Sequence, residues 1–124
     1  AADAAGMGYG LASDVGGGTS FSPFHTMLAA YCVGREGQSK QGLSLTPGRL
    51  WWLHTAGAAR ALGLEGVVGN LQPGNEADFV VLDPKATPLL ARKTSQASSL
   101  DELLFALIVL GDDRVIERTV IAGQ

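Results

Sequence analysis

A short apolar segment that ends in an aspartate and a glycine-rich loop constrains the fold of this chain more than any other feature. Residues 9–13 read Tyr-Gly-Leu-Ala-Ser, a run typical of a strand buried on both faces, and Asp14 follows it directly. The loop 15–20 contains three glycines, and Ser22 followed by Pro23 is a helix-start signal. Strand, loop and helix in this order are typical of parallel sheets and barrels, so the sequence predicts an α/β fold.

Two amphipathic helices are predicted after this loop. The first begins at Pro23, and a polar connection over residues 34–44 separates it from the second, which begins at Thr46 and ends at Gly63. The apolar face of the first helix comprises Phe24, Met27, Leu28 and Tyr31. The shared face of the second comprises Leu50, Leu53, His54, Ala58, Ala61 and Leu62.

The second half of the chain has a different pattern. Residues 66–71 and 78–82 read as two strands joined by a turn, and residues 84–98 read as an irregular Pro-, Ser- and Thr-rich stretch. Ser99 and Glu102 form a capping box ahead of an apolar third helix that ends at residue 110. After a break at residues 111–113, a last strand is predicted over residues 115–122.

Composition limits the classes of partner. The 124 residues are 46% apolar and 17% charged with a formal net charge of −3, which is typical of a soluble globular domain. No basic run suggests a nucleic-acid surface, no signal peptide is evident, and no apolar run approaches the ~20 residues of a membrane span. The single cysteine, Cys32, is interpreted as a small buried hydrophobe and fits a reducing compartment. We therefore expect a cytoplasmic protein that binds neither nucleic acid nor membranes.

Asp14 is the residue with the clearest chemical potential. A carboxylate at the carboxyl end of a buried strand can ligate a divalent metal or accept a proton from a metal-bound water. An aspartate before a run of glycines is also a common turn former or helix-cap partner. The pattern alone leaves both interpretations open.

Four sequence runs carry a family resemblance, namely residues 10–22, 69–83, 86–90 and 110–114. They are similar to guanine deaminases, a branch of the amidohydrolase superfamily. Residues 10–22, GLASDVGGGTSFS, are similar to the last metal-binding motif of that branch, and residues 17–22 distinguish it from other deaminases of the superfamily. Residues 69–83, GNLQPGNEADFVVLD, are similar to the strand pair of the small β domain common to amidohydrolases. Residues 86–90, ATPLL, and 110–114, LGDDR, resemble further hallmarks of guanine deaminases. The runs occur in order through nearly the whole chain.

The resemblance implies the C-terminal segment of a metal-dependent (β/α)8 barrel together with strands of a small β-sandwich domain. Residues 1–64 would then be the last barrel strand with its following helices. Residues 65–83 would be strands of the small β domain, and residues 84–124 a C-terminal linker, helix and final strand. The complete polypeptide is expected to form a homodimer.

The resemblance also implies a chemistry. In the family one Zn²⁺ is surrounded by four histidines and one aspartate, a separate glutamate relays protons, and a zinc-activated water converts guanine to xanthine and ammonia. Asp14 matches the aspartate, so it is expected to be both a zinc ligand and the catalytic acceptor of the water's proton.

The same resemblance shows what the chain lacks. The family's histidine ligands and glutamate correspond to positions upstream of residue 1, and the two histidines present, His25 and His54, lie on the predicted helices and match no ligand position. The chain also starts in what reads as a helix end and stops after a strand-like run. These observations predict a fragment of a longer protein, without deaminase activity when isolated, because one carboxylate cannot hold Zn²⁺ tightly.

Other chemistry-bearing residues have simpler interpretations. A Cys32–His25 dyad would span two helical turns, ~10 Å, which is too far for a thiolate pair. The loop 16–20 could cradle a phosphate, but it lacks the lysine of a P-loop. We interpret Trp51 and Trp52 as core or interface anchors. Asp78, Asp83 and the run Asp112-Asp113-Arg114 are interpreted as turn residues, with subunit contact as the alternative for the run.

Two alternatives to guanine deamination remain at this stage. The complete protein could be another purine, pyrimidine or triazine aminohydrolase of the same superfamily, or the chain could be a non-catalytic assembly module. A lone barrel strand would lack partners, so we do not expect the isolated chain to form a stable compact monomer. The residues expected to form its exposed apolar patch are Leu50, Trp51, Leu103, Leu104, Phe105 and Leu107.

Overall fold

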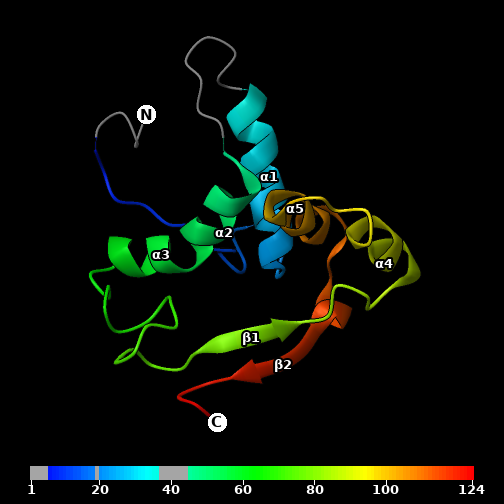
Figure 1. Ribbon diagram of the computed structural model, residues 1–124. Helices are drawn as coiled ribbons and strands as arrows, with labels where there is room; N and C mark the ends of the chain where they lie inside the picture. Colours follow the sequence, from blue (N-terminus) through cyan, green and yellow to red (C-terminus); the bar gives the residue numbers. More distant parts are fainter. Residues whose placement is uncertain (1–5, 19, 37–44) are drawn as a thin grey trace.

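The computed structural model describes residues 6–18, 20–36 and 45–124 as five α-helices, a short 3-10 helix and a two-stranded sheet (Figure 1). In chain order the elements are α1 (Pro23–Glu36), α2 (Pro47–His54), α3 (Ala56–Ala61), β1 (Phe79–Leu82), α4 (Pro88–Thr94), α5 (Leu100–Leu110), η2 (Asp113–Val115) and β2 (Ile116–Val120). In these ranges no helix is long and apolar enough to cross a membrane.

The hydrophobic core lies around α5, which packs against α1, α2 and α4 (Figure 1). Its members are Phe24, Met27, Leu50, Leu90, Ala106, Leu107, Ile108 and Val115. Aromatic contacts extend it: the rings of Phe24 and Trp51 lie 5.9 Å apart, and those of Tyr31 and Phe105 lie 4.9 Å apart. The Trp51 indole Nε1 also donates to the carbonyl of Leu104 at 3.3 Å. The packing of α2 on α5 therefore combines apolar burial with a polar contact that satisfies the indole.

This packing corrects one expectation. Leu50 and Leu107 are buried, and Trp51, Leu103, Leu104 and Phe105 are half-buried, so these residues do not form an exposed patch. The expectation was wrong because α2 and α5 cover each other's apolar faces.

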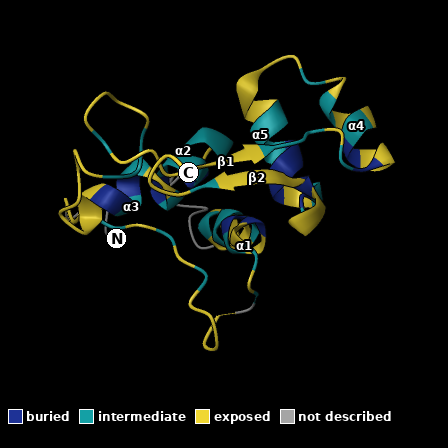
Figure 2. Ribbon diagram, turned by 90° about the horizontal axis from the view of Figure 1, so that it is seen from below, coloured by how far each residue is buried: buried dark blue, intermediate teal, exposed yellow. Residues whose placement is uncertain are grey.

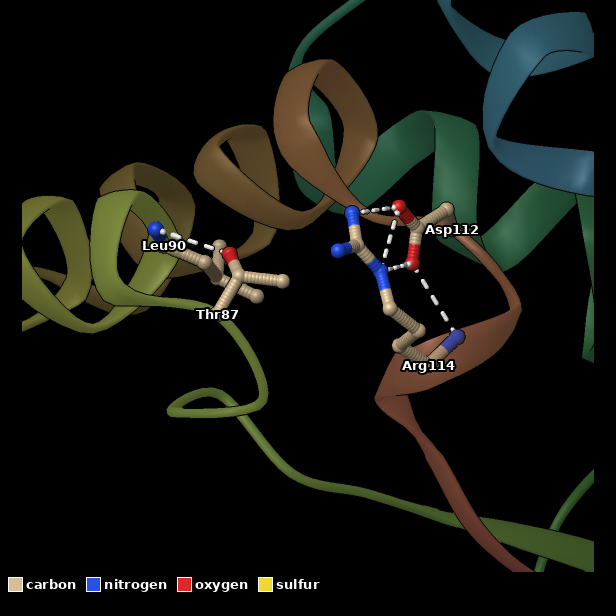
Figure 3. Close-up of polar contacts among 4 residues, drawn as sticks. All are labelled: Thr87, Leu90, Asp112 and Arg114. Atoms are coloured by element: carbon tan, nitrogen blue, oxygen red, sulfur yellow. Dashed lines mark hydrogen bonds and ion pairs between the residues drawn. The ribbon is translucent and has the colours of Figure 1, made fainter.

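Side-chain hydroxyls fix three helix starts. Thr46, Thr87 and Ser99 each accept a hydrogen bond from the backbone N–H three residues later. Figure 3 shows the Thr87 contact with the N–H of Leu90 at 3.3 Å. The helix that Thr87 begins, α4, lies in the stretch 84–98 that we expected to be irregular.

The expected capping box at the start of α5 forms only in part. Ser99 accepts from the N–H of Glu102, but the Glu102 carboxylate accepts from the backbone N–H and hydroxyl of Ser98, at 2.7 and 3.0 Å. These hydrogen bonds lower the pKa of Glu102 below its usual value. In a complete capping box Glu102 would accept from the N–H of the N-cap residue Ser99, whereas here it accepts from Ser98, one residue earlier.

The two strands pair with each other in an antiparallel ribbon. The register joins Phe79 to Val120 and Val80 to Thr119, with a bulge before Leu82 meets Ile116. Most residues of both strands are exposed, as Figure 2 shows. Buried Val115 anchors the ribbon to the core.

The strand expected at residues 66–71 was wrong, because this segment consists of turns. The Asn70 side-chain oxygen accepts from the N–H of Gln72 and from the amide of Asn75, both at 2.9 Å, and Gly66 and Gly69 have positive φ. Asparagine side-chain bonds and left-handed glycines favour turns over a ladder. The pairing partner of β1 is therefore the distant β2.

The expected single helix over residues 46–62 is interrupted at Thr55. Its φ of −123° and ψ of −106° are not helical, and its hydroxyl donates to the carbonyl of Trp51 at 3.0 Å. The expected apolar face does not continue through α3, since Ala61 and Leu62 are exposed. The helical stop at Gly63 is confirmed by its φ of 71°.

Candidate functional site

Asp14 lies where the extended segment 9–13 turns into the glycine-rich loop. Its side chain is exposed and its φ is 49°, a left-handed conformation that aspartate tolerates better than most residues. The Asp14 carbonyl accepts from the N–H of Gly17 at 2.9 Å and from the N–H of Gly18. The loop therefore folds back over the aspartate that precedes it.

Two glycines make this fold-back sterically feasible. A Cβ on Gly17 would lie 2.7 Å from Asp14 Oδ2, and one on Gly18 would overlap the carbonyl of Ser13. The loop also lines a hollow of about 220 Å³ with Val15, Gly16, Gly18, Ser20 and Phe21. The arrangement presents an exposed carboxylate beside closely packed backbone.

Residues 9–13 do not form the expected strand, because the only strands in the described part of the chain are β1 and β2. The segment lies instead beside α2 and α3, where the N–H of Leu11 donates to the carbonyl of Leu53 at 2.9 Å. Gly10 lies so close to α3 that a Cβ there would be 2.7 Å from Ala58 Cα. A glycine inside a strand-like run is a signal of close backbone approach, and Gly10 is such a glycine, so this contact had a signal in the sequence that the strand prediction did not use.

The two histidines do not join Asp14. His25 is exposed on α1. His54 is half-buried on α2, its Nε2 has no hydrogen-bond partner among the described residues, and burial lowers the pKa of its imidazole. Residues 6–18, 20–36 and 45–124 contain no group of three or more His, Cys, Asp or Glu side chains that could hold a metal. At the candidate site the described residues thus offer the carboxylate of Asp14, a donor that fits zinc but cannot bind it alone.

The remaining candidates are one cysteine and two tryptophans. Cys32 is exposed on α1, so its interpretation as a buried hydrophobe was wrong. Trp51 packs against the core, as expected. Trp52 is half-buried, and the guanidinium of Arg49 stacks on its ring at 4.2 Å.

Two of the acidic positions have the expected role in turns, and one does not. Asp83 accepts from the N–H of Lys85 at 2.8 Å, within a turn, whereas Asp78, expected to be a turn residue, accepts from the N–H of Ala122 at 2.7 Å, far along the chain. Figure 3 shows that Asp112 accepts from both the backbone and the guanidinium of Arg114. The Arg114 hydrogen bond lowers the pKa of Asp112. Asp112 therefore stabilises the turn between α5 and β2.

The class of protein follows from a family comparison. A sequence model described as "Amidohydrolase family" matches residues 1–124. The chain belongs to this family.

Individual relatives show which members of the family the chain is similar to. The chain is 42% identical to a guanine deaminase of Escherichia coli over 93% of its length and 40% identical to a probable guanine deaminase of Deinococcus radiodurans over 97%. The resemblance to guanine deaminases is thereby confirmed. The chain spans about a quarter of the length of these relatives, 25% and 27%.

Solved structures agree with the sequence comparison. The chain superimposes on E. coli guanine deaminase with a TM-score of 0.84, covering 93% of this chain and 26% of that one. Guanine deaminase from Bradyrhizobium japonicum gives a TM-score of 0.76 at 33% identity, covering 90% and 29%. The mixed helix and strand arrangement is therefore that of part of an amidohydrolase.

Proposed function

We propose that this chain contributes to an enzyme that hydrolyses guanine to xanthine and ammonia. The observation that carries the proposal is the agreement of sequence and structure with E. coli guanine deaminase, at 42% identity and a TM-score of 0.84. The structural likeness covers 93% of this chain.

Within that enzyme we propose the division made from the sequence. Residues 1–64 complete a (β/α)8 barrel, residues 65–83 contribute to a small β-sandwich domain, and residues 84–124 follow as linker, helix and strand. The extended backbone of residues 9–13 is compatible with pairing to neighbouring barrel strands, and the exposed ribbon of β1 and β2 is compatible with covering by further strands. A homodimer and a cytoplasmic location complete the proposal.

Asp14 is the residue through which this chain takes part in the reaction. Zn²⁺, when bound, would supply a water made acidic enough to react near neutral pH. The Asp14 carboxylate would occupy one position in the metal's donor set and accept a proton from the attacking water. Its exposure at the loop leaves it accessible to donors from other parts of the polypeptide. Those donors must provide at least two further ligands, because tetrahedral catalytic sites use three protein ligands.

The experiment is to complete the enzyme by joining residues 1–124 to the upstream part of E. coli guanine deaminase, in place of that enzyme's own C-terminal quarter. We expect the folded, zinc-loaded protein to convert guanine to xanthine, measured by absorbance and ammonia release, while the isolated chain shows no turnover. Adenine, cytosine and an aminotriazine are tested in parallel. A folded chimera that deaminates one of these in preference to guanine, or none at all, contradicts the proposal.

A further inference from the structure

The break between α2 and α3 changes what the carbonyl of Leu53 bonds to. In an uninterrupted helix this carbonyl would accept from the N–H of Gly57, four residues on. Here the non-helical backbone of Thr55 separates the two helices, and the Leu53 carbonyl accepts from the N–H of Leu11 at 2.9 Å. One backbone hydrogen bond thus joins the helix break to the segment that leads into Asp14 (Figure 1).

Gly10 lets this hydrogen bond form. A Cβ at this position would lie 2.7 Å from Ala58 Cα, 2.8 Å from Ala58 Cβ and 3.2 Å from the Leu53 carbonyl oxygen. Gly10 is not among the glycines with positive φ, so the requirement is for space and not for backbone conformation. Leu53 and Ala58 lie on either side of the break, so the segment is seated against both helices.

The seat is close enough to Asp14 to control its position. Leu11 precedes Asp14 by three residues, which in extended backbone span roughly 10 Å. On the other side of Asp14, the hydrogen bonds from Gly17 and Gly18 hold its carbonyl. The aspartate is therefore fixed between a seat against α2 and α3 and a closed loop.

We propose that Gly10 and the helix break at Thr55 position Asp14 for the reaction. The proposal rests on the proposed function, since it gives the contact of residues 9–13 with α2 and α3 a role in the reaction proposed for Asp14. Gly10→Ala would have to move the segment by about 0.7 Å to bring its Cβ to an ordinary contact distance of 3.4 Å. A displacement of this size in a reacting group can reduce turnover by about 10²-fold.

Gly8 offers a matched control on the same segment. A Cβ at Gly8 would meet Ala61 Cα at 3.7 Å, an ordinary contact, so Gly8→Ala makes the same chemical change without a clash. Thr55→Ala is a second perturbing variant that introduces no new atom. It removes the hydroxyl that bonds to Trp51 and allows the helix to close over the break, so that Gly57 competes with Leu11 for the Leu53 carbonyl.

The test uses the completed enzyme described above and three measurements: hydrogen–deuterium exchange of the peptide containing Leu11, zinc content, and kcat and KM for guanine. For Gly10→Ala we expect faster exchange at Leu11 and a kcat per zinc-loaded enzyme about 10²-fold lower, with KM nearly unchanged. Thr55→Ala should show a smaller change in the same direction, and Gly8→Ala should match the unsubstituted enzyme.

The outcomes separate this proposal from the proposed function. If the unsubstituted enzyme has no guanine deaminase activity, the proposed function fails, and this role fails with it. If that enzyme is active but Gly10→Ala and Gly8→Ala share the same exchange and the same kcat per zinc, the positioning role is refuted. If Gly10→Ala lowers only the amount of folded protein and leaves kcat per zinc unchanged, Gly10 is structural, and the positioning role is again refuted.

Discussion

The surface area of the chain predicts that it associates with other polypeptide when isolated. Its accessible surface is 8264 Å². A compact monomer of 12.8 kDa is expected to expose ~6,300 Å², so the chain exposes roughly 2,000 Å² in excess. A standard protein–protein interface buries only about 800 Å² on each partner. The excess is therefore large enough to support stable association.

The ribbon of β1 and β2 contributes exposed apolar residues to this surface. Val80 is 50% exposed, and a groove of about 550 Å³ runs between β1 and the helices α2 and α3. We expect Val80→Lys to weaken self-association, because it replaces exposed apolar surface of the ribbon with a charge. Thr119→Lys is the matched control: Thr119 lies opposite Val80 on the same face but contributes little apolar surface.

The assay is sedimentation velocity of residues 1–124 over a wide concentration range, combined with thermal unfolding. We expect concentration-dependent association and no sharp cooperative transition for the unsubstituted chain, with Val80→Lys reducing association more than Thr119→Lys does. A concentration-independent monomer with one cooperative unfolding transition would refute the reasoning, because it would mean that the excess surface needs no partner.

Three further predictions concern single residues in the completed enzyme. Asp14→Asn should lower kcat at least ~10²-fold with zinc still bound, because the proton acceptor is lost; near-normal turnover would reduce Asp14 to a loop former. Leu50→Ala, at a fully buried position, should lower the free energy of unfolding by about 2–5 kcal/mol, and exposed Leu100→Ala should lower it by about 0.5 kcal/mol or less. The two variants are compared by the urea concentration at which the amides of α5 lose their protection from hydrogen exchange. Burial lowers the pKa of His54 in the folded protein below the unfolded-state pKa of 6.5. The contribution of His54 to the free energy of unfolding should therefore be fully present above pH 6.5 and should decrease as the pH falls towards the folded-state pKa. His54→Gln should remove that part of the pH dependence of the melting temperature.

The parts of the fold that could be predicted from sequence are set by neighbours in the chain. The start of α2 after Thr46 and the start of α5 after Ser99 follow from hydroxyl caps, and Gly63 follows from its ability to adopt positive φ. The start of α4 has the same signal as that of α2, a threonine followed by a proline: Thr87–Pro88 and Thr46–Pro47. It was missed because the surrounding Ser and Thr residues favoured an irregular stretch.

The parts that could not be predicted depend on residues far apart in the chain. β1 pairs with β2 across α4 and α5, a pairing that no local pattern in either strand shows. The turns at residues 66–71, by contrast, had local signals in Gly66, Gly69 and Asn70, which the apolar run outweighed in the prediction. The contact of Gly10 with Ala58 likewise depends on how a distant helix is broken. At the candidate site, the motif singles out Asp14 as a candidate, whereas the left-handed backbone of Asp14 could not be predicted from it.

The contact of residues 9–13 with α2 and α3 and the excess accessible surface bear on the same question, namely what holds Asp14 in place. In the proposed barrel, strand neighbours would pair the backbone of this segment, which has no strand beside it in the described ranges. The hydrogen bond from Leu11 to Leu53 uses an N–H that an edge-to-edge ladder could also use, so the helix break and a neighbouring strand cannot both bond to it fully. The absence of a side chain at Gly10 lets α3 approach the segment closely, and the Leu53 carbonyl occupies one hydrogen-bonding position on its edge. The contact with α2 and α3 therefore sets how far from these helices Asp14 lies. Strand pairing along the remaining N–H and C=O groups of residues 9–13 would set the direction in which the segment runs towards Asp14.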